Sequence, residues 1–358
     1  MSLFDLAIKK SLKKKDDDVL ALKSDSFVVK TNIHFPTDYT LLYDSSRKAL
    51  DCITKIMKRQ QTKGFQLLTG WRKQKSWYKT LKIIARTIGT TSKKGGKNKT
   101  TDLEKVVQEY ITLCSKLNNK LCESIYEVHH QADICIGIYV EELKKYMKYQ
   151  MILMDQLERR IIKKEVIPNE EKIYSIFEPH TEWINKGKLY PNVELGKRLT
   201  ITTDQYQMII HHVIMEKQSD SQIVDKLNEE VSTKWKIQSW SFDKGYYSKE
   251  NKELLKNEVP EVILPKKGKK NQVEKVEESQ KRYKKLRNNH SAVESNINEL
   301  EYRGLDKCPD KGYDNFKRYI ALSVCAYNLH KIGAYMQEVQ RVKIEGKKEK
   351  PKPKLKAA

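Results

Sequence analysis

Two isolated acidic residues stand where their side chains could hold a metal ion. Asp243 ends a short apolar segment, residues 237–242, whose pattern predicts a β-strand. Glu294 lies 51 residues further on, in a segment that predicts a helix. Carboxylate oxygens are the ligands that Mg²⁺ prefers in proteins. A carboxylate at a strand end and another on a later helix are typical of a site for metal-dependent phosphoryl transfer.

The third carboxylate of such a site has two candidates. Asp25 lies in an extended segment, residues 19–33, on the same face of a period-two pattern as Phe27 and Val29. An unpaired carboxylate among apolar side chains is costly, and metal binding would remove that cost. The alternative is that Asp25 is solvated at a strand edge. Asp204 is the rival, but it lies in a predicted turn, where an acid is expected for turn chemistry alone. We therefore favour Asp25.

Four polar residues near these acids are candidate DNA contacts. Lys244 directly follows the strand-end acid and could meet a phosphate. His290 and Asn298 lie one helical turn before and after Glu294, so either could orient that carboxylate or touch DNA. Arg287 is a further candidate phosphate contact. Solvation at the surface is the better explanation for Arg287, and helix capping explains His290 equally well.

The net charge favours a polyanionic partner. The 358 residues include 70 Lys and Arg against 47 Asp and Glu, which gives a formal charge of +23. Such an excess raises the local concentration of polyanions, of which nucleic acid is the commonest, and the binding should weaken steeply with salt. The alternative is a charge that serves solubility or reflects a lysine-rich genome.

Cysteine usage and hydropathy indicate a cytoplasmic protein. None of the six cysteines forms a CxxC pair, and no histidine cluster completes the spacing of a zinc site, so we expect reduced thiols. Residues 1–18 lack the apolar core of a signal peptide. No stretch approaches the roughly 20 apolar residues of a membrane span. We therefore expect no membrane partner.

The order of predicted elements indicates the fold class. After the first strand, residues 37–164 show helical spacing, and later segments return to strands. Without the helical block, three strands can run antiparallel and a crossover helix leads to a fourth. We predict an α/β, ribonuclease-H-like mixed sheet with a large all-helical insertion after the first strand. In that sheet Asp25 and Asp243 lie on neighbouring strands, and Glu294 completes the site. The predicted later elements are a hairpin (197–203 and 208–215), helices (219–231, 248–256, 272–287, 291–302 and 316–336) and strands (236–243 and 261–265).

We divide the chain into four parts on this basis. Residues 1–36 are an N-terminal segment with the first catalytic strand, and residues 37–170 are the helical insertion. Residues 171–338 form the remainder of the catalytic domain. Residues 339–358 are rich in Lys and Arg with little apolar content, so we expect a disordered basic tail.

Several ordered segments resemble bacterial insertion-sequence transposases with an Asp-Asp-Glu (DDE) catalytic site. The similarity spans about residues 19–333. The segments are residues 25–38 (first catalytic strand), 176–188 (where the catalytic domain resumes), 241–246 (second acid), 290–308 (third acid), and 318–322 with 327–329.

This resemblance implies a function and a metal site. Asp25, Asp243 and Glu294 would hold two Mg²⁺ ions, for which Mn²⁺ can substitute. The enzyme would cleave DNA at insertion-element ends and transfer the strand into target DNA, without a covalent protein intermediate. Its partners would be element ends and target DNA, on which it would act as a homo-oligomer. It would work in the bacterial cytoplasm, associated with the nucleoid.

Two other functions remain open at this point. One is a non-catalytic DNA-binding remnant of a transposase, and the other is a general nuclease with a ribonuclease-H-like fold. The family usually has a helical DNA-recognition region before the first strand, whereas 24 residues precede Asp25 here. We therefore expect either a shortened chain or an insertion that binds DNA in its place.

Overall fold

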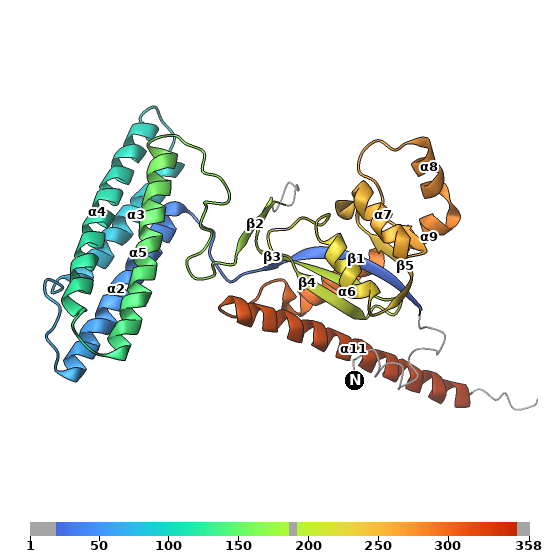
Figure 1. Ribbon diagram of the computed structural model, residues 1–358. Helices are drawn as coiled ribbons and strands as arrows, with labels where there is room; N and C mark the ends of the chain where they lie inside the picture. Colours follow the sequence, from blue (N-terminus) through green and yellow to red (C-terminus); the bar gives the residue numbers. More distant parts are fainter. Residues whose placement is uncertain (1–18, 186–191, 349–358) are drawn as a thin grey trace, which may run out of the picture. The chain divides into compact units, whose positions relative to one another are not determined.

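The computed structural model describes residues 19–185 and 192–348 of the chain (Figure 1). The chain divides into two compact units. Unit 1 comprises Met1–Asn32 and Glu182–Ala358, and unit 2 comprises Ile33–Thr181. Residues 1–18, 186–191 and 349–358 lie outside the described part, so the predicted N-terminal segment falls largely outside it.

Unit 1 contains a mixed sheet. β1 is the centre of the strand order β2-β3-β1-β5-β6, and β4 pairs with β3 (Figure 1). β1 runs antiparallel to β3 and parallel to β5, while β6 runs parallel to β5. This mixed α/β arrangement is compatible with a ribonuclease-H-like fold. The strands are β1 (Val19–Lys30), β2 (Glu182–Asn185), β3 (Val193–Thr203), β4 (Ile209–Ile214), β5 (Lys236–Phe242) and β6 (Glu261–Ile263).

Helices pack on both faces of this sheet because alternate side chains of β1 enter different cores. Leu20 and Leu22 belong to a cluster that includes residues of α6 and α7. Phe27 and Val29 belong to a second cluster that includes residues of α10 and α11. Successive residues of a strand point to opposite faces, so Asp25 is on the α10 side. The helices are α6 (Val224–Ser232), α7 (Lys249–Glu258), α8 (Gln272–Ser279), α9 (Lys281–Asn289), α10 (Ser291–Leu300) and α11 (Tyr313–Lys348).

Unit 2 is a bundle of long helices around one hydrophobic core. Its core includes Leu50 of α2, Leu81 of α3, Leu117 of α4 and Leu153 of α5, all fully buried. Trp71 is also core, since it is 3% exposed and its Nε1 donates to the Ser124 hydroxyl at 2.8 Å. The helices are α2 (Asp38–Lys63), α3 (Gln74–Lys93), α4 (Lys99–Val128) and α5 (Ile134–Ile161).

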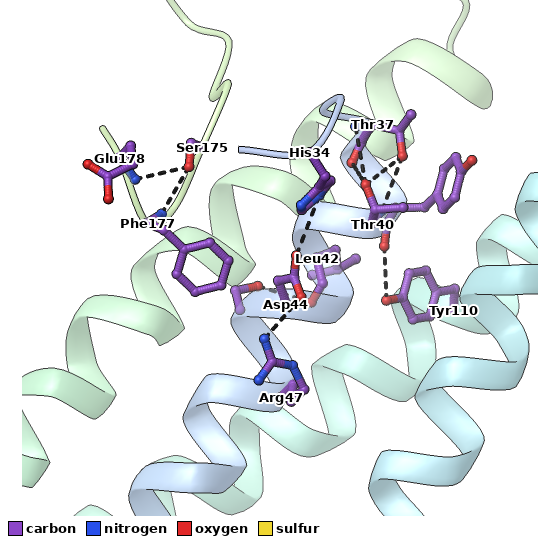
Figure 2. Close-up of polar contacts among 12 residues, drawn as sticks. His34, Thr37, Thr40, Leu42, Asp44, Arg47, Tyr110, Ser175, Phe177 and Glu178 are labelled. Atoms are coloured by element: carbon purple, nitrogen blue, oxygen red, sulfur yellow. Dashed lines mark hydrogen bonds and ion pairs between the residues drawn. The ribbon is translucent and has the colours of Figure 1, made fainter. Parts of the chain in front are cut away.

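A capping box starts α2, the first helix of unit 2 (Figure 2). The Thr37 hydroxyl accepts from the Thr40 backbone N–H, and the Thr40 hydroxyl accepts from the Thr37 backbone N–H. Nearby, Asp44 pairs with His34 and with Arg47 (Figure 2). The Tyr110 hydroxyl of α4 donates to the Tyr39 carbonyl oxygen at 3.3 Å. The capping-box bonds satisfy backbone N–H groups that the start of a helix leaves without partners.

Several predicted elements are confirmed and others shift. The hairpin is β3 and β4, and the predicted strand 236–243 is β5. Within the helical block predicted at residues 37–164, the segment 64–73 is not helical, and α3 begins at Gln74 and ends at Lys93. Gly64 and Gly70, with φ of 69° and 72°, hold the preceding segment in a non-helical path.

The expected helix at 272–287 is divided. α8 ends and α9 begins on either side of Gln280, whose ψ of 138° is incompatible with a helix. The expected helix at 219–231 starts at Val224, and the Gln222 side chain accepts from the Ser219 backbone N–H ahead of it.

The predicted tail is helical over its first part, contrary to expectation. α11 continues to Lys348, so residues 339–348 are not disordered here. An ion pair between Arg341 and Glu338, one turn apart, supports this extension, since such pairs stabilise helices. Residues 349–358 lie outside the described part. The division at residues 36/37 and 170/171 stays a prediction; the two units separate at 32/33 and 181/182.

The predictions about thiols and membrane spans can also be compared with the structure. All six cysteines are free thiols, as expected. Within residues 19–185 and 192–348, no helix has the length and apolar character that crossing a bilayer requires.

Candidate active site

Asp25 and Asp243 follow the last matched pair of two adjacent parallel strands. The register of β1 and β5 pairs Lys23 with Ser241 and Ser24 with Phe242. Asp25 directly follows Ser24, and Asp243 directly follows Phe242. The two acids therefore lie side by side although they are 218 positions apart in the sequence. Asp25 is half-buried within β1, whereas Asp243 is exposed at the end of β5.

Both acids lie on the face of the sheet that α10 covers. Asp25 is two residues before Phe27 and so lies on the same face of β1; Phe27 packs in one cluster with Val293 of α10. Asp243 is two residues after Ser241 and so lies on the same face as Ser241, whose hydroxyl shares a hydrogen bond of 3.0 Å with Nδ1 of His290 at the start of α10. Strand alternation therefore directs both carboxylates toward the same helix.

Glu294 is on that helix. Its neighbours Val293 and Ile297 are buried against the sheet, while Glu294 itself is exposed. The apolar stripe of α10 thus fixes the helix and leaves Glu294 at the margin of the packed face. The structure brings the three predicted acids into one region, from two strands and one helix.

The electrostatics of Asp25 reflect this crowding. Burial is the main cause that raises its pKa from 3.8 to about 7, and the nearby carboxylates of Asp243, Asp220 and Glu294 add to it. The Ser26 backbone N–H donates to Oδ1 of Asp25 at 2.7 Å and opposes the shift. Burial and the three neighbouring carboxylates together favour protonation of Asp25.

Asp220 is a fourth acid that the sequence did not indicate. The Ser26 hydroxyl donates to its Oδ1 at 2.7 Å, and Nη1 of Arg198 lies 3.6 Å from the same oxygen. The side chains of the neighbouring residues Asp25 and Ser26 point to opposite faces of the sheet, so Asp220 approaches β1 from the face opposite to Asp25. Its position in an irregular segment before α6 carries no local signal that could have identified it.

Gly245 has a packing role beside this acid. A Cβ at Gly245 would lie 2.9 Å from Oδ2 of Asp220, closer than real Cβ contacts. Any other residue would push Asp220 away or shift the turn Lys244–Tyr246 that follows Asp243. Close approach, rather than a left-handed backbone, therefore explains the glycine after the second acid.

His290 is a buried residue. It is 9% exposed, and burial lowers its pKa to about 4, so its imidazole is neutral at pH 7. Its bond to Ser241 links the start of α10 to β5. This placement suits a residue that positions α10 and does not suit a direct DNA contact.

The other predicted contacts are exposed. Lys244 follows Asp243 in a 3₁₀ turn, Arg287 is on α9, and Asn298 is on α10 one turn after Glu294.

Asp204, the rival first acid, is fully buried in the turn between β3 and β4. Its Oδ1 accepts from the backbone N–H groups of Tyr206 and Met208, at 2.8 and 2.9 Å. This is turn chemistry, and it directs the carboxylate to the backbone.

The donor set of Asp25, Asp243 and Glu294 suits a divalent cation. In the described part of the chain, no three Asp, Glu, His or Cys side chains converge closely enough to hold a metal ion as they stand. The three acids nevertheless supply hard oxygen ligands and an uncompensated negative charge, which is the chemistry that Mg²⁺ selects. A bound cation would offset the repulsion that now favours protonated Asp25.

Comparison with known families assigns the chain. The model of the transposase DDE domain family matches residues 143–329, which is more than half of the 358 residues. The chain belongs to this transposase family. The matched segment of the transposase includes Asp243 and Glu294, and it begins after Asp25. Membership implies interaction with DNA. The searches of curated proteins and of solved structures gave no match.

Proposed function

We propose that this transposase cleaves DNA at the ends of an insertion element and joins the freed strand to target DNA. The main support is geometric: Asp25 and Asp243 end up side by side on parallel strands, under the helix that carries Glu294. In this proposal unit 1 is a ribonuclease-H-like catalytic domain, and unit 2 is a helical insertion after β1.

Asp25, Asp243 and Glu294 would hold two Mg²⁺ ions, with Mn²⁺ as a substitute. Such ions supply Lewis acidity to the attacking and leaving oxygens of the phosphodiester. The chain offers no covalent nucleophile in this proposal, and water or a DNA 3′-hydroxyl attacks.

Neighbouring residues hold the three acids in place. The Ser26 N–H fixes one oxygen of Asp25 and leaves the other free to act as a ligand. The Ser241–His290 hydrogen bond ties the end of β5 to the start of α10, and therefore sets the spacing of Asp243 from Glu294. Lys244, exposed beside Asp243, is our first choice for a phosphate contact at this edge. Arg287 and Asn298 are further candidates.

A cleavage assay tests this proposal. The full chain is incubated with Mg²⁺ or Mn²⁺ and DNA that carries the element's own ends, beside Asp243→Asn and a control, Asp225→Asn. Asp225 is an exposed acid on α6 in the same unit, so the substitution Asp225→Asn makes the same change of charge away from the site. We expect cleavage and joining by the wild type and the control, and none by Asp243→Asn.

The other outcomes identify the alternatives. Cleavage without joining, at DNA of any sequence, would indicate a general nuclease. DNA binding without metal-dependent cleavage would indicate a non-catalytic remnant and overturn the proposed activity. Joining of two ends in one product would support a homo-oligomer on DNA.

The identity of the first acid has its own test. Asp25→Asn should abolish cleavage, while Asp204→Asn should retain it. Asparagine keeps an oxygen at Asp204 that can accept from Tyr206 and Met208, so this variant should also keep the turn. Loss of cleavage only in Asp204→Asn would replace Asp25 by Asp204 in the site.

A further inference from the structure

Unit 2 has a segregated distribution of charge. Residues 52–101 contain 14 Lys and Arg and no Asp or Glu. The rest of the unit, residues 33–51 and 102–181, carries 13 Lys and Arg against 17 Asp and Glu. The positive charge of this unit is therefore concentrated in α3, the end of α2 and the segments that flank α3.

Helix α3 gathers part of this charge in a line. At about 100° per residue, five of its cations fall within an arc of about 60°. The buried residues Leu81, Ala85 and Ile88 are on a different side of the helix. At 1.5 Å per residue the line is about 27 Å long. We name it the α3 stripe, and it consists of Lys75, Lys79, Lys82, Arg86 and Lys93.

The α3 stripe is exposed and lacks acidic partners within the described residues. All five side chains are exposed in unit 2. No carboxylate of the described part forms an ion pair with any of them, whereas Arg59 in the same acid-free segment pairs with Asp133 at 2.8 Å. Lys55 pairs with Glu142 at 2.9 Å. Lys55 and Arg59 are thus neutralised locally, whereas the five cations of the stripe are not.

We propose that the α3 stripe binds the phosphate backbone of duplex DNA. Four cations of the stripe are one helical turn apart, and the fifth lies two turns further along α3. Such a row is complementary to a row of phosphates, and it offers no acceptor that could read bases. The contact is therefore independent of sequence. This inference rests on the proposed function, because it assigns a second DNA contact to the same transposase, outside the active site. It requires neither metal nor cleavage.

Salt dependence gives the expected magnitude. Each phosphate that a cation neutralises adds about 0.9 to the slope of log affinity against log salt. Removal of four stripe cations should therefore reduce the slope by about 3 to 4. Over a fourfold rise in salt, the wild-type affinity should fall roughly 100-fold more than that of the variant.

The test is an anisotropy titration of the full chain with a mixed-sequence duplex, in EDTA and over a series of salt concentrations. The test variant is Lys75→Gln, Lys79→Gln, Lys82→Gln and Arg86→Gln together; glutamine is a good helix former. The matched control has the same charge change on exposed lysines elsewhere in unit 2. It is Lys144→Gln, Lys145→Gln, Lys148→Gln and Lys163→Gln.

The proposal expects a reduced slope in the stripe variant, nearly the wild-type slope in the control, and the same loss for duplexes of different sequence. Equal slopes for the two variants would overturn it. A stripe variant that loses binding only to single-stranded DNA or RNA would also overturn it. The titration is run in EDTA, where the proposed cleavage does not occur, so failure of the catalytic proposal and failure of this one are separate results.

Discussion

Asp25→Asn should stabilise the folded protein although it abolishes the proposed activity. The structure places this carboxylate half-buried in β1 and near Asp243, Asp220 and Glu294. Without metal, the native state therefore disfavours the charged form of Asp25. Asparagine is similar in size and carries no charge, so it removes the cost of burying the charge and also the repulsion. Active-site residues that lower stability in this way are a common source of the trade-off between stability and activity.

The magnitude follows from the pKa of Asp25, which is raised from 3.8 to about 7. A difference of one pKa unit between the native and unfolded states corresponds to about 1.4 kcal/mol. The fully ionised Asp25 therefore lowers the free energy of unfolding by at most about 4 kcal/mol. The native state binds the extra proton between these two pH values, so stability falls as the pH rises from about 4 to about 7. The gain from Asp25→Asn should be near zero at pH 4 and largest above pH 7.

Urea unfolding in EDTA, at several pH values between 4 and 8, measures this gain. Replacement of Trp71 and Trp77 by phenylalanine in every variant leaves Trp183, Trp235 and Trp240, all in unit 1, as the fluorescent reporters. Asp225→Asn is the control, and as an exposed substitution it should change stability by no more than about 0.5 kcal/mol.

Two results would refute this reasoning. One is a gain for Asp25→Asn that does not grow with pH, and the other is a loss of stability above pH 7. Either would mean that Asp25 is not buried near these carboxylates as the structure places it. Mg²⁺ provides a further check, because it should stabilise the wild type by binding to the native state and have little effect on Asp25→Asn.

Two other predictions concern the scaffold. Gly196→Ala should destabilise unit 1 by about 3 kcal/mol or more, because the new Cβ would lie 2.1 Å from the Val29 carbonyl oxygen; Gly333→Ala, in open space on α11, should instead stabilise by about 0.5–1 kcal/mol. Urea unfolding compares the two, and similar effects would contradict the close β1–β3 approach. Asp133→Asn should destabilise unit 2 at pH 7, because the hydrogen bonds from Arg59 lower the pKa of Asp133 to about 2. That stabilisation exists above pH 3.8 and disappears as the pH falls toward 2, so the variant and the wild type should converge in acid unfolding.

Local patterns were sufficient where a segment's neighbours in sequence decide its structure. The period-two alternation around residues 197–215 predicts the hairpin, and β5 is recognisable from its apolar run. The acids Asp243 and Glu294 were recognisable because each follows or belongs to such an element. The family match over residues 143–329 covers both.

Local patterns failed where distant contacts decide the outcome. Gln280 divides a predicted helix into α8 and α9. The start of α3 follows a segment that Gly64 and Gly70, both with positive φ, hold in a non-helical path. His290 has the sequence position of a DNA contact, but packing buries it against Ser241. No pattern around Asp220 predicts its approach to β1.

Residue types and periodicities are local properties, so the amino-acid chain already indicates carboxylates at element ends, a basic character, and alternating strands and helices. Which of these groups meet depends on the packing of distant segments. Asp25 and Asp243 are 218 residues apart, and they become neighbours because β1 and β5 pair in parallel in one register. Hydrogen bonding between strands and burial on both faces of the sheet select that register, and neither is encoded within a single segment.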